Sequence, residues 1–471
     1  MIELIRMKKL SGKGIYLLLC CIFFLFAGSC QTVKSEIVSV NNDDGTIEVG
    51  VARVDITPEG PIRLAGYGSR QTESDGILQH LEAKALAFGN DSQDPSLFIT
   101  VDLIGIPGHV TAELRERLSK RIGFNPSHLV ISSSHTHTGP EIGILLNHFG
   151  APLPTDQLGR IVQNLDKLID KLEEVAMAAL DDRKPSLVYR GQGEVGFAVN
   201  RRVIQNNVWT GFGINPEGPV DHALPLLKIT DREGVIRALL INYACHGTTL
   251  GPNINKIHND WIGETQRLLE QNYPGAIALV SIGAGGDANP EPRTELEHTQ
   301  NHAREIADEV DQLLSGSLQQ LTQAPVGRYQ EIELPFAHVP NVDELIEQTN
   351  DAGAKGYYAR LALERIARGE SIPESLSYPI QTWKFGDDLT MVFLAGEVVV
   401  DYSLRLKKEL ENEQLWVTAY ANDVPSYIAS RRVIREGGYE VDSSMYSYDR
   451  PSRFVEEIED LIIETVHKLL Q

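Results

Sequence analysis

The segment around residues 129–140 constrains the fold more than any other part of the sequence. Apolar and small residues at 129–134 lead into His135 and His137, and Gly139 and Pro140 follow at once. Such a run predicts a β-strand, which the Gly-Pro pair ends. Because side chains alternate between the faces of a strand, both histidines are expected on one face, where they can converge. The pattern indicates a metal site or an acid–base pair, and two solvated histidines at a polar strand end are the alternative.

The segments before this motif alternate between strand and helix patterns. Strands are predicted at residues 46–56, 81–89 and 96–104, and residues 110–122 have the apolar spacing of a helix. A strand, a helix and a further strand in that order indicate a crossover connection, and therefore some parallel sheet.

The rest of the chain continues the alternation. Helices are predicted at 157–180, 261–272, 294–314, 342–368 and 454–470. Strands are predicted at 186–189, 194–199, 224–229, 235–244, 277–282, 329–334, 381–385, 390–395 and 415–420. The polar stretch with Asn200, Arg201 and Arg202 is expected to be irregular. Because no repeat or linker interrupts residues 46–471, we predict an α/β fold, with one large domain, a mixed β-sheet core flanked by helices, and an active site at strand ends.

The first 29 residues have the pattern of a signal peptide. Basic residues precede an apolar run at 15–26 that is too short and too early for a good transmembrane span. Small residues at 27–29 come directly before Cys30, which is typical of a bacterial lipoprotein whose cysteine becomes the lipid-modified first residue. A plain secretory signal or an uncleaved anchor is the alternative. Residues 30–45 would then be a polar tether, and we expect an exported protein, lipid-anchored in the periplasm or the outer membrane of a bacterial envelope.

Composition limits the partners and the sources of stability. The net charge of −22, with no basic cluster after the leader, argues against a nucleic-acid partner. Cys20 and Cys21 lie in the leader and Cys30 would be acylated, so Cys245 alone remains in the body and no disulfide can form there. Without a disulfide, the core must be stabilised by burial and by any bound metal. No protein partner is inferred.

Three further candidate ligands lie where predicted strands end. His246 follows the strand at 235–244, Glu397 follows the strand at 390–395, and a tyrosine-rich loop follows the strand at 415–420. Taken alone, a histidine such as His246 is more often a core residue, a Gly-Glu pair at a strand end is more often a turn, and a tyrosine in such a loop is more often an ordinary loop residue. The loop tyrosines are Tyr427, Tyr439, Tyr446 and Tyr448. Together with the two histidines, these residues supply the nitrogen and oxygen donors that zinc accepts, with room for water.

An ordered set of short motifs resembles the neutral/alkaline, non-lysosomal ceramidase family. The motifs are GVARVDITP at 50–58, LAGY at 64–67, VD at 101–102, SHTHTGP at 134–140, NR at 200–201, CH at 245–246, GD at 286–287, GE at 396–397 and the tyrosine-rich loop. The resemblance runs from about Gly50 to the end of the chain.

The resemblance implies a role for each matching residue. Four residues would bind one zinc ion per chain: His135, His246, Glu397 and Tyr427. His137 would be the general acid and base, while Arg201 and Tyr439 would face the substrate carbonyl oxygen. The implied reaction is hydrolysis of an amide bond in an N-acyl, ceramide-like lipid. In it, zinc polarises the carbonyl and lowers the pKa of the attacking water towards about 7.

Two features depart from the family pattern. Where the family has a serine in a Gly-Asp-Val-Ser-Pro type of turn, this sequence has Asn289 within GDANP at 286–290. The family also carries a C-terminal sandwich-like domain after the tyrosine loop, for which the residues up to Gln471 leave no room. Both departures bear on the recognition of ceramide, whereas zinc chemistry tolerates them.

Other functions therefore stay open. The protein could be a zinc-dependent amidase or esterase with a non-sphingolipid substrate, or a lipid-binding lipoprotein of the same fold that lost catalysis at Asn289. A metal-dependent barrel hydrolase fits poorly. Its His-x-His motif should open an eight-fold series of strands and helices, whereas here the motif lies about a quarter of the way along the chain.

The lipoprotein pattern makes a direct prediction about Cys30. Mature protein should begin at this cysteine and carry lipid, because small residues precede it after an apolar run. Radiolabelled palmitate is expected to enter the wild type and not Cys30→Ser. Equal labelling of the two proteins would rule out a lipid anchor at this residue.

Overall fold

The computed structural model describes residues 44–143 and 153–471. The predicted signal peptide, Cys30 and all but the last two residues of the predicted tether lie outside the described residues. Within the described ranges, no helix combines the length and the apolar character needed to cross a bilayer.

A nine-stranded mixed sheet forms the centre of the fold. In spatial order its strands are β10 (Ile277–Ile282), β9 (Ile236–Tyr243), β8 (Ala223–Thr230), β5 (Lys184–Glu194), β1 (Ile47–Asp55), β2 (Glu82–Phe88), β3 (Ser96–Val101) and β4 (Leu129–Ser133), with β12 (Gln319–Leu321) beside β5. The pairs β9/β10 and β3/β4 are parallel, whereas the other neighbours are antiparallel. Each parallel pair is joined by a crossover helix, α4 (Asp260–Asn272) or α2 (Gly108–Ile122). The predicted mixed sheet is confirmed.

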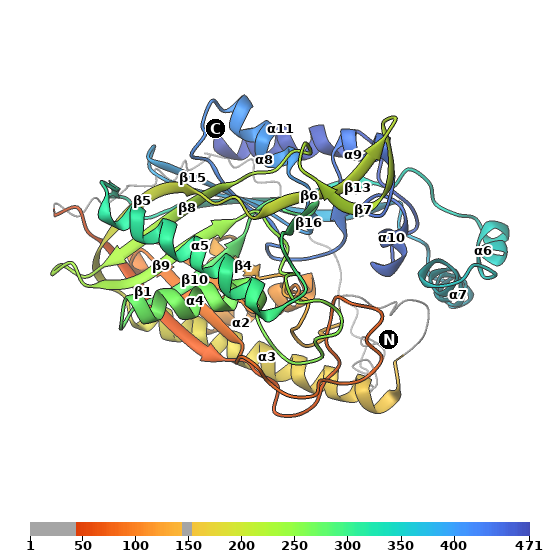
Figure 1. Ribbon diagram of the computed structural model, residues 1–471, viewed down its shortest axis with the longest axis horizontal. Coiled ribbons are helices and arrows are strands. Elements are labelled where there is room, and N and C mark those ends of the chain that lie inside the picture. The colour runs from red at the N-terminus through yellow and green to blue at the C-terminus, as the bar shows by residue number, and fades with distance from the viewer. Residues whose placement is uncertain (1–43, 144–152) are drawn as a thin grey trace, which may run out of the picture. The chain divides into compact units, whose positions relative to one another are not determined.

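A second sheet packs on one face of the first (Figure 1). Its strands are β13 (Val326–Pro335), β14 (Ser375–Phe385), β15 (Leu389–Leu394) and β17 (Trp416–Thr418). Large buried rings fill the space between the sheets, and the ring of Trp383 lies 6.1 Å from that of Phe98 and 5.2 Å from that of Phe393. Because the side chains of a strand alternate, Phe98 enters this layer, while Leu97 and Ile99 on the same strand belong to the apolar cluster under the helices. Burial on both faces explains why β3 reads as a continuous apolar run.

Helices cover both outer faces of the stacked sheets (Figure 1). On the nine-stranded sheet, α2 and α3 (Thr155–Asp181) lie over the strands at the β1–β4 end, and α4 and α5 (Leu296–Ser315) lie near β10 and β5. On the second sheet, α11 (Ile458–Leu470) lies over β13 and β14 and contacts α8 (Asp401–Glu409). Buried residues at helical spacing on α3, from Leu165 to Leu172, form its apolar face.

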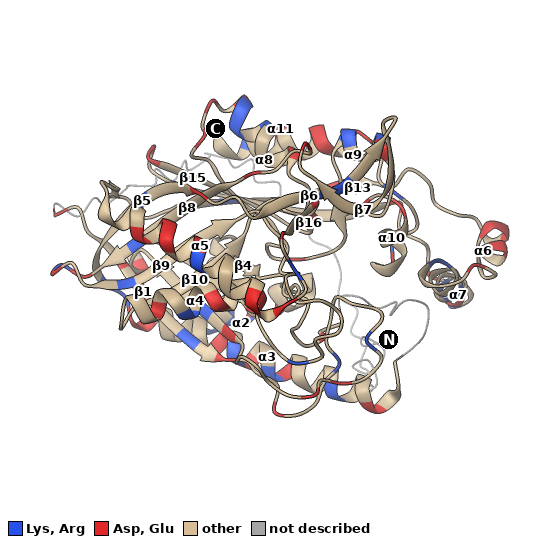
Figure 2. Cartoon of the chain, in the orientation of Figure 1, with Lys and Arg blue, Asp and Glu red and all other residues tan. Residues whose placement is uncertain are grey.

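The outer helices carry charges of both signs close together (Figure 2). Arg117 on α2, for example, lies 3.2 Å from Glu173 and 2.8 Å from Asp170 on α3. Positive side chains on these helices are therefore neutralised locally, even though the chain as a whole is strongly acidic.

The remaining strands form two small sheets. One contains β11 (Ala288–Pro290), β6 (Ala198–Gln205) and β7 (Val208–Asn215), and the other contains β16 (Glu397–Val398) and β18 (Tyr427–Ile428). The remaining α-helices are α6 (Val342–Gln348), α7 (Ala354–Ala367), α9 (Arg431–Glu436) and α10 (Ser443–Ser447).

Three local predictions were wrong. The strand predicted at 194–199 is a break between two strands, because β5 ends at Glu194 and β6 begins at Ala198. The stretch with Asn200, Arg201 and Arg202 is not irregular, because it lies on β6 and pairs with β7 in an antiparallel hairpin. The sequence pattern missed β7 because Gly211 and Gly213 dilute its strand signal. The helix predicted at 342–368 is two helices, separated by a break that ends at Gly353 with a left-handed φ of 72°.

Candidate active site

The loops that follow β4 and β9 carry three histidines and are hydrogen-bonded to each other. The His137 amide donates to the carbonyl of Gly247 at 3.1 Å, and Thr136 and Gly247 form an isolated parallel bridge. A Cβ on Gly247 would lie 2.8 Å from the carbonyl oxygen of His135, so this approach needs a glycine. Backbone contacts beyond the strand ends therefore hold the histidine loops together.

His135 and His137 converge, although not by the predicted route. Strand β4 ends at Ser133, so both histidines lie in the loop beyond it, and His135 has a left-handed φ of 54°. Strand alternation therefore does not orient them, and that prediction was wrong. The reversed backbone and the pairing with Gly247 place their Nε2 atoms 3.2 Å apart. A non-glycine residue held in this conformation is typical of functional sites.

His135 and His246 are oriented by their Nδ1 atoms. Nδ1 of His135 lies 2.7 Å from the carbonyl oxygen of Ile104, and Nδ1 of His246 lies 2.8 Å from that of Gly285. A carbonyl only accepts hydrogen bonds, so each Nδ1 carries the proton and the Nε2 of each neutral ring has the lone pair. His137 differs, because its buried Nδ1 has no hydrogen-bond partner.

Glu397 provides a carboxylate between the histidines. Its Oε2 lies 3.1 Å from Nε2 of His135 and 3.1 Å from Nε2 of His246, and all three side chains are buried. Burial by itself raises the pKa of Glu397, but the adjacent imidazoles outweigh it and hold that pKa well below its usual range. Burial and the charge of Arg201 lower the pKa of His246 to about 3. The carboxylate is therefore ionised and the imidazole neutral, which are the forms that bind a metal.

The donor set could hold a metal ion. Imidazole nitrogens of His135, His137 and His246 lie within 4.8 Å of one another, the one such group of histidine, cysteine and acidic ligand atoms in the described part of the chain. Nitrogen donors with a neighbouring carboxylate are the ligands that zinc prefers.

Arg201 forms a second wall of the site from strand β6. Its Nη1 lies 2.9 Å from Nε2 of His246, and its Nη2 donates to the hydroxyl of Tyr427 at 3.0 Å. Its Nε donates to the fully buried carboxylate of Glu440 at 3.0 Å, and the other oxygen of Glu440 accepts from Arg202. This shared carboxylate fixes the direction of the Arg201 guanidinium.

Two rings of the tyrosine loop and one ring of β7 lie in a row beside Arg201. The ring of Tyr439 lies 5.6 Å from that of Tyr427 and 5.1 Å from that of Phe212 on β7. Burial raises the pKa of Tyr439 to about 12, so its hydroxyl stays protonated and can donate. The hydroxyl that donates to Glu397 belongs to Tyr448, to which the sequence assigned no role. Its position in the tyrosine-rich loop was a signal, whereas no pattern pointed to Glu440.

The GDANP turn packs directly behind the ligands. A Cβ on Gly286 would lie 2.6 Å from the carbonyl oxygen of Glu397, and the Asp287 carboxylate accepts from the Val400 amide at 2.9 Å and from the Asn200 side chain at 3.0 Å. Asn289 is buried, and its Oδ1 accepts from the Thr248 hydroxyl at 3.3 Å. Asn289, which stands where the family has a serine, is thus a buried and hydrogen-bonded residue next to the loop of His246.

The loop at 64–67 supports His137 from the other side. Gly66 has a φ of 91°, and a Cβ there would lie 2.4 Å from the His137 ring. The ring of Tyr67 lies 5.0 Å from the same imidazole. The imidazole therefore rests on bare backbone, as close packing requires.

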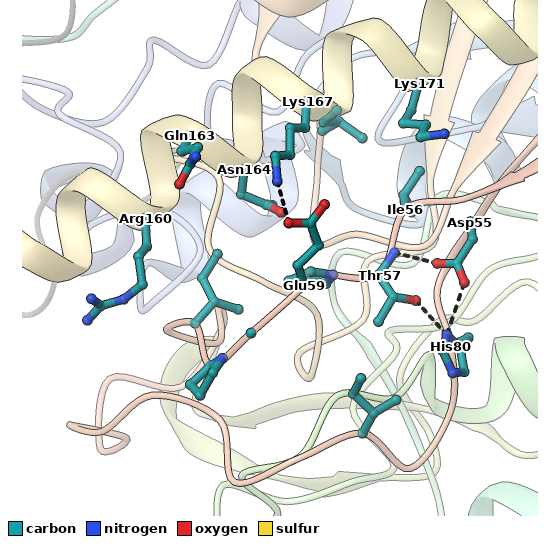
Figure 3. A pocket seen from close by; sticks show the side chains of 16 residues that line it. Asp55, Ile56, Thr57, Glu59, His80, Arg160, Gln163, Asn164, Lys167 and Lys171 are labelled. Atoms are coloured by element: carbon teal, nitrogen blue, oxygen red, sulfur yellow. Dashed lines mark hydrogen bonds and ion pairs between the residues drawn. The ribbon is translucent and has the colours of Figure 1, made fainter.

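A surface cavity of about 510 Å³ between α3 and the end of β1 also contains a histidine (Figure 3). His80 lies 3.0 Å from Asp55 and 3.2 Å from the Thr57 hydroxyl. Both contacts involve the same atom, Nδ1, so this imidazole cannot link the two residues in a nucleophile–base–acid relay. The cavity therefore does not compete with the histidine cluster as the catalytic site.

Residues 47–290 match the family model described as "Neutral/alkaline non-lysosomal ceramidase, N-terminal". The match covers more than half of the 471 residues. The chain belongs to this family. The expected family resemblance is therefore confirmed.

Individual relatives extend this comparison. A neutral ceramidase of Oryza sativa subsp. japonica is 27% identical over 233 residues, which are 47% of this chain and 28% of the relative. One of Mycobacterium tuberculosis is 28% identical over 264 residues, which are 52% of this chain and 39% of the relative. The matches to these two curated relatives therefore span well under half of their length.

The fold itself has a solved counterpart. The crystal structure of neutral ceramidase from Pseudomonas aeruginosa superposes with a TM-score of 0.68 at 15% identity, covering 90% of this chain and 74% of that one. The two proteins share the α/β architecture with its mixed sheet flanked by helices.

The geometry around Glu440 predicts a large loss of stability when its charge is removed. Glu440→Ala leaves the buried guanidinium groups of Arg201 and Arg202 without this counter-ion, and is expected to lower the free energy of unfolding by about 3–5 kcal/mol. Urea denaturation measures the loss. Glu116→Ala, which removes an exposed partner of Lys120, is the control and should change stability little. Equal losses in the two variants would show that Glu440 does not hold the network.

Proposed function

We propose that this protein is a zinc-dependent hydrolase of an amide bond whose substrates are N-acyl, ceramide-like lipids. The observation that carries the proposal is the convergence of His135, His246 and the ionised Glu397 on one buried point. Membership of the ceramidase family supports the same reaction class.

The proposed zinc ligands are His135, His246, Glu397 and Tyr427, with one ion per chain. Tyr427 is joined to the other ligands indirectly. Its hydroxyl accepts a hydrogen bond from Arg201, and Arg201 in turn contacts His246. When bound, the metal would polarise the amide carbonyl and acidify a water molecule.

His137 is the proposed general acid and base. Its Nε2 faces the cluster 3.2 Å from Nε2 of His135, while its Nδ1 lacks the carbonyl anchor of the other two histidines. With the proton on Nδ1, Nε2 can take a proton from the attacking water and later return it to the leaving amine. Gly66 holds the ring in place during both transfers.

Arg201 and Tyr439 are the proposed stabilisers of the carbonyl oxygen as it becomes negative. Arg201 is pre-oriented by Glu440, so its guanidinium does not have to reorganise during the reaction. The protonated hydroxyl of Tyr439 provides a second donor from the same side, because its ring packs against Tyr427.

An apolar surface beside these residues favours a lipid over a small soluble amide. Three residues of β7 expose half or more of their surface, and they are Val208 at 56%, Phe212 at 50% and Ile214 at 61%. Phe212 also contacts the guanidinium of Arg201 at 5.1 Å, so the exposed apolar strand continues into the site. A hydrocarbon chain can lie along such a surface while its amide reaches Arg201. Lipidation at Cys30, also a proposal, would keep the protein near such substrates.

The metal assignment predicts different effects for the three histidines. Purified wild type should contain about one zinc per chain. His135→Ala and His246→Ala should lose most of it, whereas His137→Ala should keep it, because the acid–base residue is not a ligand. Elemental analysis measures the content, and melting temperatures of the same samples show how far ligand loss also reduces stability. A His137 variant as metal-free as the His135 variant would mean that the pair is assigned the wrong way round.

The reaction is tested by turnover of a fluorescent N-acyl sphingosine beside a short N-acyl amino acid. His137→Ala should reduce the rate about 10²–10⁴-fold with zinc retained. Arg201→Ala should reduce it roughly 10²–10³-fold, the effect of losing one oxyanion donor. Asn289→Ser should change the preference between the two substrates more than the maximal rate, because Asn289 lies beside the ligands without being one. Wild type that holds full zinc and cleaves no amide would favour the lipid-binding alternative.

A further inference from the structure

The side chains of His135, His246 and Glu397 each have one polar atom that faces the other ligands and a second polar atom that does not. For the two histidines this second atom is Nδ1, and both Nδ1 atoms are held by backbone carbonyls. For Glu397 it is Oε1, which accepts a hydrogen bond from the hydroxyl of Tyr448. Among these three anchors, Tyr448 alone is a side chain, so it is the one that a substitution can remove.

We propose that Tyr448 is a positioning residue that sets the Glu397 carboxylate for metal binding. The proposal rests on the proposed function in one respect, which is that this cluster binds zinc. The tyrosine hydroxyl is the donor of this hydrogen bond, and the carboxyl oxygen Oε1 accepts it. With Oε1 held, Oε2 stays directed at the two Nε2 atoms, 3.1 Å from each.

The surroundings hold Tyr448 itself in one place. Its side chain is only 7% exposed, and its amide donates to the carbonyls of Ser444 and Met445 at the end of α10. The next residue, Asp449, binds Arg365 on α7 through both carboxylate oxygens. A buried ring, a helix end and an ion pair between Asp449 and helix α7 therefore fix the direction of the hydroxyl.

Tyr448 and Tyr427 have separable functions in this arrangement. Their rings meet edge to face with centroids 6.2 Å apart, but the hydroxyl of Tyr427 accepts from Arg201 while that of Tyr448 donates to Glu397. Loss of an outer partner of a metal ligand typically weakens metal affinity 10–100-fold, because the ligand must then be ordered on binding. That loss is expected for Tyr448→Phe, which removes the hydroxyl and keeps the ring.

The test is a competition titration of zinc against a chromophoric chelator, with full-length protein stripped of metal. Tyr448→Phe should bind zinc about 10–100-fold more weakly than the wild type. Tyr446→Phe is the matched control, since this residue lies on α10, which Tyr448 follows directly, and its ring packs against Tyr358, 5.7 Å away. This variant should bind zinc as the wild type does. Cobalt-loaded samples add a second measurement, because a carboxylate that can rotate changes the visible absorption spectrum of the ion. Melting temperatures of the metal-free proteins, expected to be equal, separate positioning from folding.

The possible outcomes distinguish this proposal from the proposed function. If the wild type binds zinc and Tyr448→Phe binds it within twofold with the same cobalt spectrum, the positioning role is overturned and the metal site stands. If both variants weaken binding equally, the effect belongs to the helix and the positioning role is also overturned. A wild type that binds no zinc overturns the proposed function and, with it, the role of Tyr448.

Discussion

The buried negative charge of Glu397 is the constraint on which the site depends. A carboxylate so far from water is costly unless neighbours compensate it. Here the Tyr448 hydroxyl donates to one oxygen, while the other faces two imidazole nitrogens that a bound cation would join to it. The compensation uses residues from loops that follow different strands. Each loop must therefore arrive with its backbone fixed, which the bridge between Thr136 and Gly247 achieves for the histidine loops.

A second buried charge network gives the opposite wall of the site its rigidity. Glu440 joins Arg201 to Arg202, and Arg202 also donates to the carbonyl of Gly437 at the end of α9. Buried ion pairs contribute little net stability, but they specify geometry, because any other arrangement leaves a charge unpaired. The hairpin of β6 and β7 is thereby locked to the tyrosine loop. Its exposed apolar residues consequently stay beside the guanidinium that the proposed reaction uses.

Much of the fold could be predicted because its strands and helices have strong local patterns. Strand β3 and helix α3 are clear, since the strand is buried on both faces and the helix on one. Strand β7 was missed because most of it is exposed and two glycines interrupt it. The conformation at His135 could not be predicted either, since a left-handed φ at a histidine is imposed by tertiary contacts rather than by local preference.

The sequence by itself determined the family, the mixed α/β fold, and the residue types that gather at strand ends, because short motifs and hydrophobic periodicity are local properties. Only the tertiary structure decided how those residues meet. It placed Arg201 on a strand against His246. It also placed the hydroxyl of Tyr448 against Glu397, although nothing in the sequence singled out Tyr448 among the tyrosines of its loop. It also brought in Glu440, which no motif marks. These contacts join residues more than 40 positions apart, and such distances are set by how the sheets pack rather than by any pattern along the chain.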